Sequence, residues 1–144
     1  MEQCIDACNS MLRGERSAVE TYDLALEKFG GDPQLDQLRR IRDDHARSVS
    51  DLSQCVLRMG GLPDESSGAW GTFANLVQKA ANLFGEESAV ESLLQGEKKG
   101  EHDYQNYLSG DKLSPDAERM FRAVLLPRVV NHIATLERIE EMID

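Results

Sequence analysis

Apolar residues recur every three or four positions along nearly the whole chain, the spacing that places side chains on one face of an α-helix. This pattern stops at Gly30 and Gly31, at Gly60 and Gly61, and at the turn-forming segment SGDKLSP. The sequence has no sustained alternation with a period of two, which would indicate β-strands. With 144 residues the chain is long enough to bury one core. We therefore expect a single all-α domain covering residues 1–144.

The breaks predict four long helices, at about residues 3–29, 33–59, 87–109 and 115–143. Asp32 with Pro33, and Ser114 with Pro115, are each an N-cap residue followed by proline, a pair that starts helices. Residues 60–86 are too long for a hairpin turn and include an amphipathic segment at about 72–84, so we expect a crossover containing a short extra helix. Pro127 lies inside the fourth helix and should distort it, because proline has no N–H to donate.

The apolar face of the first helix is interrupted by an acid, Glu15. The segment around it, LRGERSAVETYDLAL, aligns with LQGEKKGEHDYQNYL in the third helix, so that Glu15 matches Glu97 and Tyr22 matches Tyr104. In both segments a glycine precedes the acid, which would let a neighbouring backbone approach closely. The second and fourth helices place His45 and His132 on their apolar faces. These matches predict a duplicated helical hairpin, each half with one buried glutamate and one buried histidine.

Buried ionisable groups cost several kcal/mol each when they have no partner. The four side chains should therefore contact one another, water or a cation. Carboxylate oxygen and imidazole nitrogen together suit iron, manganese or zinc. One difficulty is their height along the bundle: Glu97 lies 11 residues before Leu108, whereas His132 lies 17 residues after Pro115. At 1.5 Å per residue this is a mismatch of about 9 Å, which a distortion near Pro127 or an extension of the third helix would have to absorb.

The segments LRGERSAVETYDLAL, SSGAWGTFA, LLQGEKKGEHDY and LLPRVVNHIATL resemble the ferritin-like superfamily, and more narrowly a group of small single-domain bacterial bundles of unknown function. The resemblance implies a ferritin-like four-helix bundle, made of two antiparallel hairpins joined by the crossover. Di-iron members of the superfamily take one glutamate from each of two helices and a Glu-x-x-His from each of the other two.

On that pattern Glu15 and Glu97 match the lone glutamates, and His45 and His132 match the histidines. The acids that should precede the histidines by three are replaced by Arg42 and Val129. We expect that Glu101, one turn after Glu97, could replace one of them, and Asp44 and Glu20 are adjacent candidates if the helices are rotated. The predicted metal ligands are Glu15, His45, Glu97, His132 and Glu101.

The first functional hypothesis is a metal-binding bundle, with oxidase or peroxide-consuming activity of the kind the superfamily has. The alternative is a non-catalytic bundle with a metal-free polar layer, acting by self-association or by binding a partner in a stress response. The net charge of −10 argues against nucleic acid and anionic membranes as partners. Three cysteines, with neither a signal peptide nor a membrane span, predict a cytoplasmic protein. Apolar residues outside the core faces would allow a homodimer.

Overall fold

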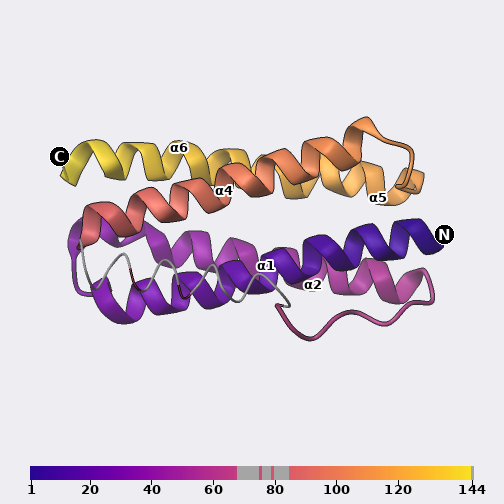
Figure 1. Ribbon diagram of the computed structural model, residues 1–144, viewed down its shortest axis with the longest axis horizontal. Helices are drawn as coiled ribbons and strands as arrows, with labels where there is room; N and C mark the ends of the chain where they lie inside the picture. The colour runs from indigo at the N-terminus through magenta and orange to yellow at the C-terminus, as the bar shows by residue number, and fades with distance from the viewer. Residues whose placement is uncertain (68–74, 76–78, 80–84, 144) are drawn as a thin grey trace.

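Four long helical segments form a bundle in which two antiparallel hairpins lie side by side (Figure 1). The computed structural model describes residues 1–67, 75, 79 and 85–143. The first hairpin is α1 (Glu2–Phe29) packed along α2 (Gln37–Arg58). The second is α4 (Glu86–Ser109) packed along α6 (Leu126–Ile143), which is preceded by α5 (Pro115–Met120). The predicted all-α four-helix bundle is confirmed.

The second and third long helices run in the same direction, so the chain must cross the length of the bundle between them (Figure 1). This is the long crossover expected from the sequence, and it connects Arg58 at the end of α2 with Glu86 at the start of α4. Near its beginning, Asp64 is held against α1 by an ion pair with Arg13 and by a hydrogen bond from Arg16 Nε to its carbonyl, at 2.7 Å. The extra helix expected at 72–84 lies almost wholly outside the described residues.

Both predicted N-caps are present. The side chain of Asp32 accepts a hydrogen bond from Gln34 N at 3.0 Å, and that of Ser114 accepts one from Ala117 N at 3.2 Å. The second helix begins later than the predicted residue 33, because the capped segment Pro33–Leu35 forms a short 3₁₀ turn, η1, before α2 starts at Gln37.

The fourth long helix is distorted just before Pro127. Residues Phe121–Leu125 form a π-helical turn, η3, in which the N–H of Leu126 donates to the carbonyl of Phe121, five residues back. Pro127 comes just after this turn. Proline has no N–H to donate, and the altered hydrogen-bond register of the π-helical turn accommodates its absence. In addition, residues 110–114 carry the chain past the end of α4, so α5 starts beyond it (Figure 1). Together these two features bring His132 level with Glu97.

The core consists of two apolar clusters with polar side chains between them. One cluster is centred on Leu12, Leu52, Tyr104 and Phe121, and the other on Leu35, Leu38, Val90 and Leu136. Each long helix passes from one cluster to the other, and between them it contributes one ionisable residue. We call these four residues the polar layer: Glu15, His45, Glu97 and His132.

None of the described helices is both long enough and apolar enough to cross a membrane.

Candidate metal centre

The four side chains of the polar layer come from four different helices and meet in the interior. Each is only 3–4 % exposed. They reach this position because each occupies a place on its helix where the apolar spacing would otherwise put a core residue. The sequence prediction that two acids and two imidazoles converge is therefore confirmed by their burial and contacts.

His45 lies at the centre of the layer, between the two glutamates. Its Nδ1 is 2.5 Å from Glu15 Oε2, and its Nε2 is 2.6 Å from Glu97 Oε1. Burial by itself would lower the pKa of His45. The negative charges of Glu97 and Glu15, with a hydrogen bond to each, outweigh burial and raise the pKa of His45 well above its ordinary value. Without a metal ion, His45 as an imidazolium therefore offsets part of the negative charge of the two carboxylates.

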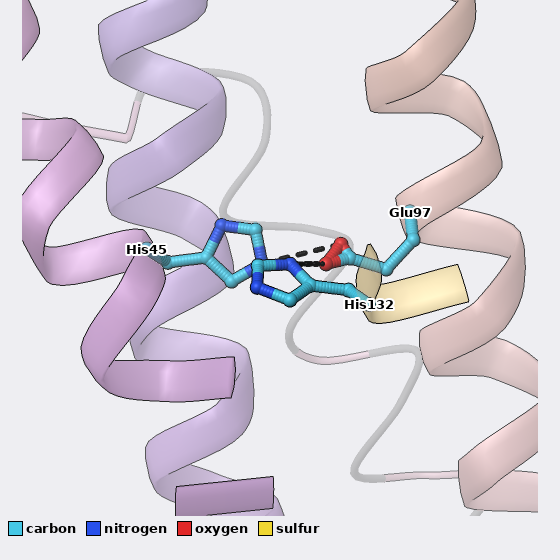
Figure 2. Close-up of side chains that lie close together, drawn as sticks. All are labelled: His45, Glu97 and His132. Carbon is cyan, nitrogen blue, oxygen red and sulfur yellow. Dashed lines mark hydrogen bonds and ion pairs between the residues drawn. The ribbon is translucent and has the colours of Figure 1, made fainter. Parts of the chain in front are cut away.

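Both histidines of the polar layer contact the carboxylate of Glu97. Figure 2 shows the imidazoles of His45 and His132 both directed at it, and His132 Nδ1 lies 2.7 Å from Glu97 Oε1. Burial would raise the pKa of Glu97, but the charge of His45 and the hydrogen bonds from His132 and His45 lower it to about 2. Glu97 is therefore a carboxylate at any physiological pH.

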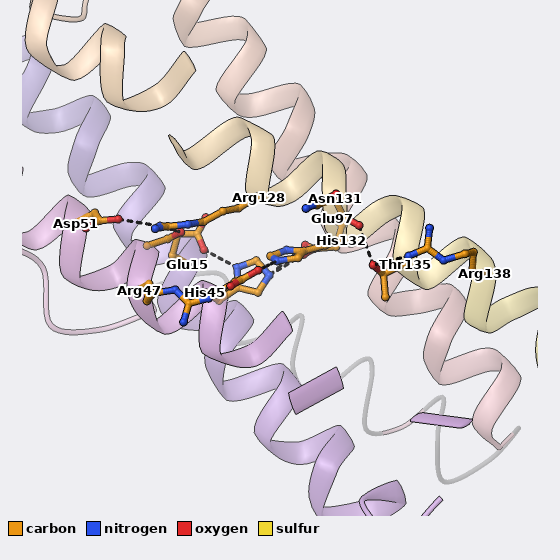
Figure 3. A network of polar contacts seen from close by, with 12 residues as sticks. Glu15, His45, Arg47, Asp51, Glu97, Arg128, Asn131, His132, Thr135 and Arg138 are labelled. Carbon is orange, nitrogen blue, oxygen red and sulfur yellow. Dashed lines mark hydrogen bonds and ion pairs between the residues drawn. The ribbon is translucent and has the colours of Figure 1, made fainter. Parts of the chain in front are cut away.

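The outer nitrogen of each histidine also faces a carboxylate. Glu15 takes this position on His45, and Asp44 takes it on His132, with Asp44 Oδ2 2.8 Å from Nε2. Asp44 in turn pairs with Arg47 at the surface. Figure 3 shows Arg47 close to Glu15 and His45 of the layer. Asp44 is not one of the five predicted ligands, although the sequence made it an adjacent candidate. The sequence feature that indicates this contact is the position of Asp44 directly before His45, which turns the Asp44 side chain toward α6.

Two tyrosines flank the layer. Tyr104 donates a hydrogen bond from its hydroxyl to Glu15 Oε1 at 2.7 Å. Tyr22 stacks on the His45 ring, with 5.4 Å between ring centroids and 24° between ring planes. The hydroxyl of Tyr22 is buried and has no hydrogen-bond partner among the described residues.

Of the other residues weighed from the sequence, none joins the layer through a described contact. Glu101 is half-buried on α4, outside the hydrogen bonds and ion pairs found among the described residues. Arg42 is directed away from the core, where it pairs with Asp23 at 2.9 Å. Val129 is buried in the apolar cluster around Phe121. The two positions where di-iron bundles carry their further glutamates thus supply no carboxylate here.

Three residues of the layer could hold a metal ion. His45, Glu97 and His132 each offer one ligand atom, and these three atoms lie within 4.8 Å of one another. Two imidazole nitrogens and a carboxylate oxygen are a donor set that transition metals take.

The fold and this layer define a four-helix bundle with a buried His–Glu–His centre. The chain belongs to the family described as a domain of unknown function (DUF2383), whose model matches residues 3–110. The matched region contains Glu15, His45 and Glu97, and it ends before α5, so His132 lies beyond it. Comparison with curated proteins and with solved structures finds no significant match.

Proposed function

We propose that the protein binds one divalent transition-metal ion, iron, manganese or zinc, in the polar layer. The ligands are Nε2 of His45, Nδ1 of His132 and the carboxylate of Glu97. The observation that carries the proposal is the proximity of these three buried ligand atoms, all within 4.8 Å. An ion would replace the direct contacts between the histidines and Glu97.

The surroundings of the two histidines support this set of ligands. In metal sites the ring nitrogen that does not bind the ion usually donates to a carboxylate, which fixes the tautomer and the orientation of the ring. Glu15 and Asp44 occupy this outer position on His45 and His132 respectively. The sequence predicted Glu15 as a metal ligand. We instead infer that Glu15 orients the His45 ring through its contact with Nδ1.

A single ion fits the donor set better than a pair. The acids that di-iron bundles place three residues before each histidine are Arg42 and Val129 in this chain. Two histidines and one carboxylate are the ligand set of mononuclear iron(II) oxygenases and also occur in catalytic zinc sites. A bound ion would supply Lewis-acid chemistry, or redox chemistry in the case of iron or manganese. The two-hairpin connectivity supports placing the chain in the ferritin-like superfamily.

A second candidate function is favoured by the hydrogen bonds themselves. The polar layer is connected without any ion, through contacts of 2.5–2.7 Å between His45, Glu97, Glu15 and His132. Such a layer could fix the register of the helices while the protein acts by self-association or by binding a partner in a stress response.

Elemental analysis separates the two functions. The protein, stripped with a chelator and dialysed against Fe(II), Mn(II) or Zn(II), should retain about one equivalent of one of these ions. Glu97→Gln should retain none, because it removes the only carboxylate among the three ligands. Glu91→Gln, an exposed position on the same helix, is the matched control and should bind like the parent.

A parent protein that binds none of the three ions would contradict the first function and favour the second, the metal-free polar layer. Glu101→Gln tests the remaining predicted ligand directly: unchanged stoichiometry and affinity would exclude Glu101 from the site.

A further inference from the structure

A small cavity lies between α1 and α4, next to the polar layer. Its volume is about 50 Å³, and its lining includes Glu15, Tyr22, His45 and Glu97. A buried water needs roughly 10–15 Å³, so the cavity has room for a few atoms only. It touches two of the three proposed ligands, His45 and Glu97, and is therefore a place where a second molecule could reach an ion held there.

One of the residues that line the cavity, Tyr22, carries a hydrogen-bond donor without a partner among the described residues. Tyr22 lines the cavity and is 2 % exposed, and among the described residues its hydroxyl is the buried side-chain polar atom left without a partner. A buried group of this kind costs free energy unless something accepts its hydrogen bond.

The unpartnered hydroxyl of Tyr22 departs from the symmetry of the internal repeat. Tyr22 corresponds to Tyr104, and Glu97 corresponds to Glu15. Tyr104 donates to Glu15 at 2.7 Å, but the equivalent bond from Tyr22 to Glu97 is absent. Glu97 is instead engaged by the two histidines. The half of the centre that contains Tyr104 is closed by a hydrogen bond, whereas the half that contains Tyr22 faces the cavity.

We propose that the cavity binds one small hydrogen-bond-accepting anion beside the ion of the polar layer, and that the Tyr22 hydroxyl donates a hydrogen bond to it. The inference rests on the proposed function, because the charges of Glu15 and Glu97 would repel an anion unless a cation were present. The size of the cavity limits the anion to about three heavy atoms, as in azide.

Two variants change the lining of the cavity, one on α1 and one on α4. Tyr22→Phe removes only the unpaired hydroxyl and should fold as the parent does. Gly100→Leu places a side chain in the cavity from α4, where an added Cβ would meet Val129 Cγ1 at 4.0 Å and, among the described atoms, nothing nearer. Tyr107→Phe is the control, because Tyr107 packs near Phe121, outside the cavity lining.

The experiment is an azide titration of the cobalt(II)-loaded protein, followed by the visible absorption of the ion. Cobalt stoichiometry is measured first for every variant. The parent should bind one cobalt(II) and then azide. Tyr22→Phe should keep the cobalt and bind azide about tenfold more weakly, and Gly100→Leu should lose azide binding. Tyr107→Phe should match the parent in both respects.

The outcomes separate this inference from the proposed function. Azide binding by Tyr22→Phe that equals the parent's, with cobalt in place, overturns the inference and leaves the metal site standing. The same holds if the cobalt-loaded parent does not bind azide. A parent that takes up neither cobalt nor any of iron, manganese and zinc overturns both.

Discussion

Replacing Glu97 by glutamine removes the charge that both histidines of the polar layer contact, while the size of the side chain hardly changes. The structure predicts a large loss of stability in the metal-free protein. Glu97 is 4 % exposed and contacts His45 Nε2 at 2.6 Å and His132 Nδ1 at 2.7 Å. In the variant, the imidazolium of His45 keeps only Glu15 as a charged partner.

The size of the loss follows from the pKa of Glu97. A decrease from the ordinary value of 4.5 to about 2 corresponds to roughly 3 kcal/mol of folding free energy at neutral pH. Breaking a buried ion pair by removing one partner typically costs about 3–5 kcal/mol, which agrees. Because a domain of this size has about 5–15 kcal/mol of stability in total, the variant should remain folded with a clearly reduced margin.

The lowered pKa of Glu97 also determines how the loss of folding stability in Glu97→Gln depends on pH. The contribution of Glu97 is fully present above pH 4.5, because the carboxyl is then ionised in both the folded and the unfolded protein. It is lost as the pH falls toward 2, where the folded protein also takes up the proton. The difference between parent and variant should therefore shrink as the pH falls from 4.5 toward 2.

Urea denaturation followed by circular dichroism, with a chelator present, measures this difference. We expect about 3 kcal/mol at pH 7, and less than about 0.5 kcal/mol for the exposed control Glu91→Gln. A loss below about 1 kcal/mol at pH 7, or a loss that does not decrease between pH 4.5 and 2.5, would refute the reasoning.

Three further predictions use the same protein. Tyr104→Phe removes the hydrogen bond to buried Glu15 and should cost about 1–3 kcal/mol in urea denaturation; an unchanged midpoint would contradict that bond. Gly100→Ala should stabilise the metal-free protein by about 0.5–1 kcal/mol, because Gly100 lies inside α4 and its added Cβ meets Val129 at 4.0 Å; thermal denaturation would show a lower midpoint if this is wrong. Zinc at one hundred times its dissociation constant should stabilise the parent by about 2.7 kcal/mol, with no such shift in Glu97→Gln.

The helices and the members of the polar layer could be predicted from the sequence because each is a local departure from a regular pattern. Glu15 and Glu97 interrupt apolar faces, and their surrounding segments align with each other. The histidines likewise occupy core positions. A side chain on the buried face of a bundle helix has only the interior to point to, so convergence follows once the topology is given.

The contacts that distinguish the two halves could not be predicted in the same way. The repeat makes Tyr22 and Tyr104 equivalent, but Glu97 contacts two histidines, and in the part of the chain that the structure describes the Tyr22 hydroxyl has no partner. The contact of Asp44 with His132 depends on how α2 and α6 face each other, which spacing within one helix does not fix. The height of His132 depends on the π-helical turn and on the path of residues 110–114, for which Pro127 gave only a partial signal.

The most direct test of the metal centre is a crystal structure of the zinc-loaded protein, with anomalous diffraction recorded at the zinc absorption edge. We expect one strong anomalous peak, bonded to Nε2 of His45, Nδ1 of His132 and the carboxylate of Glu97. A zinc-loaded crystal in which these side chains still contact one another directly, with no anomalous peak between them, would contradict the account.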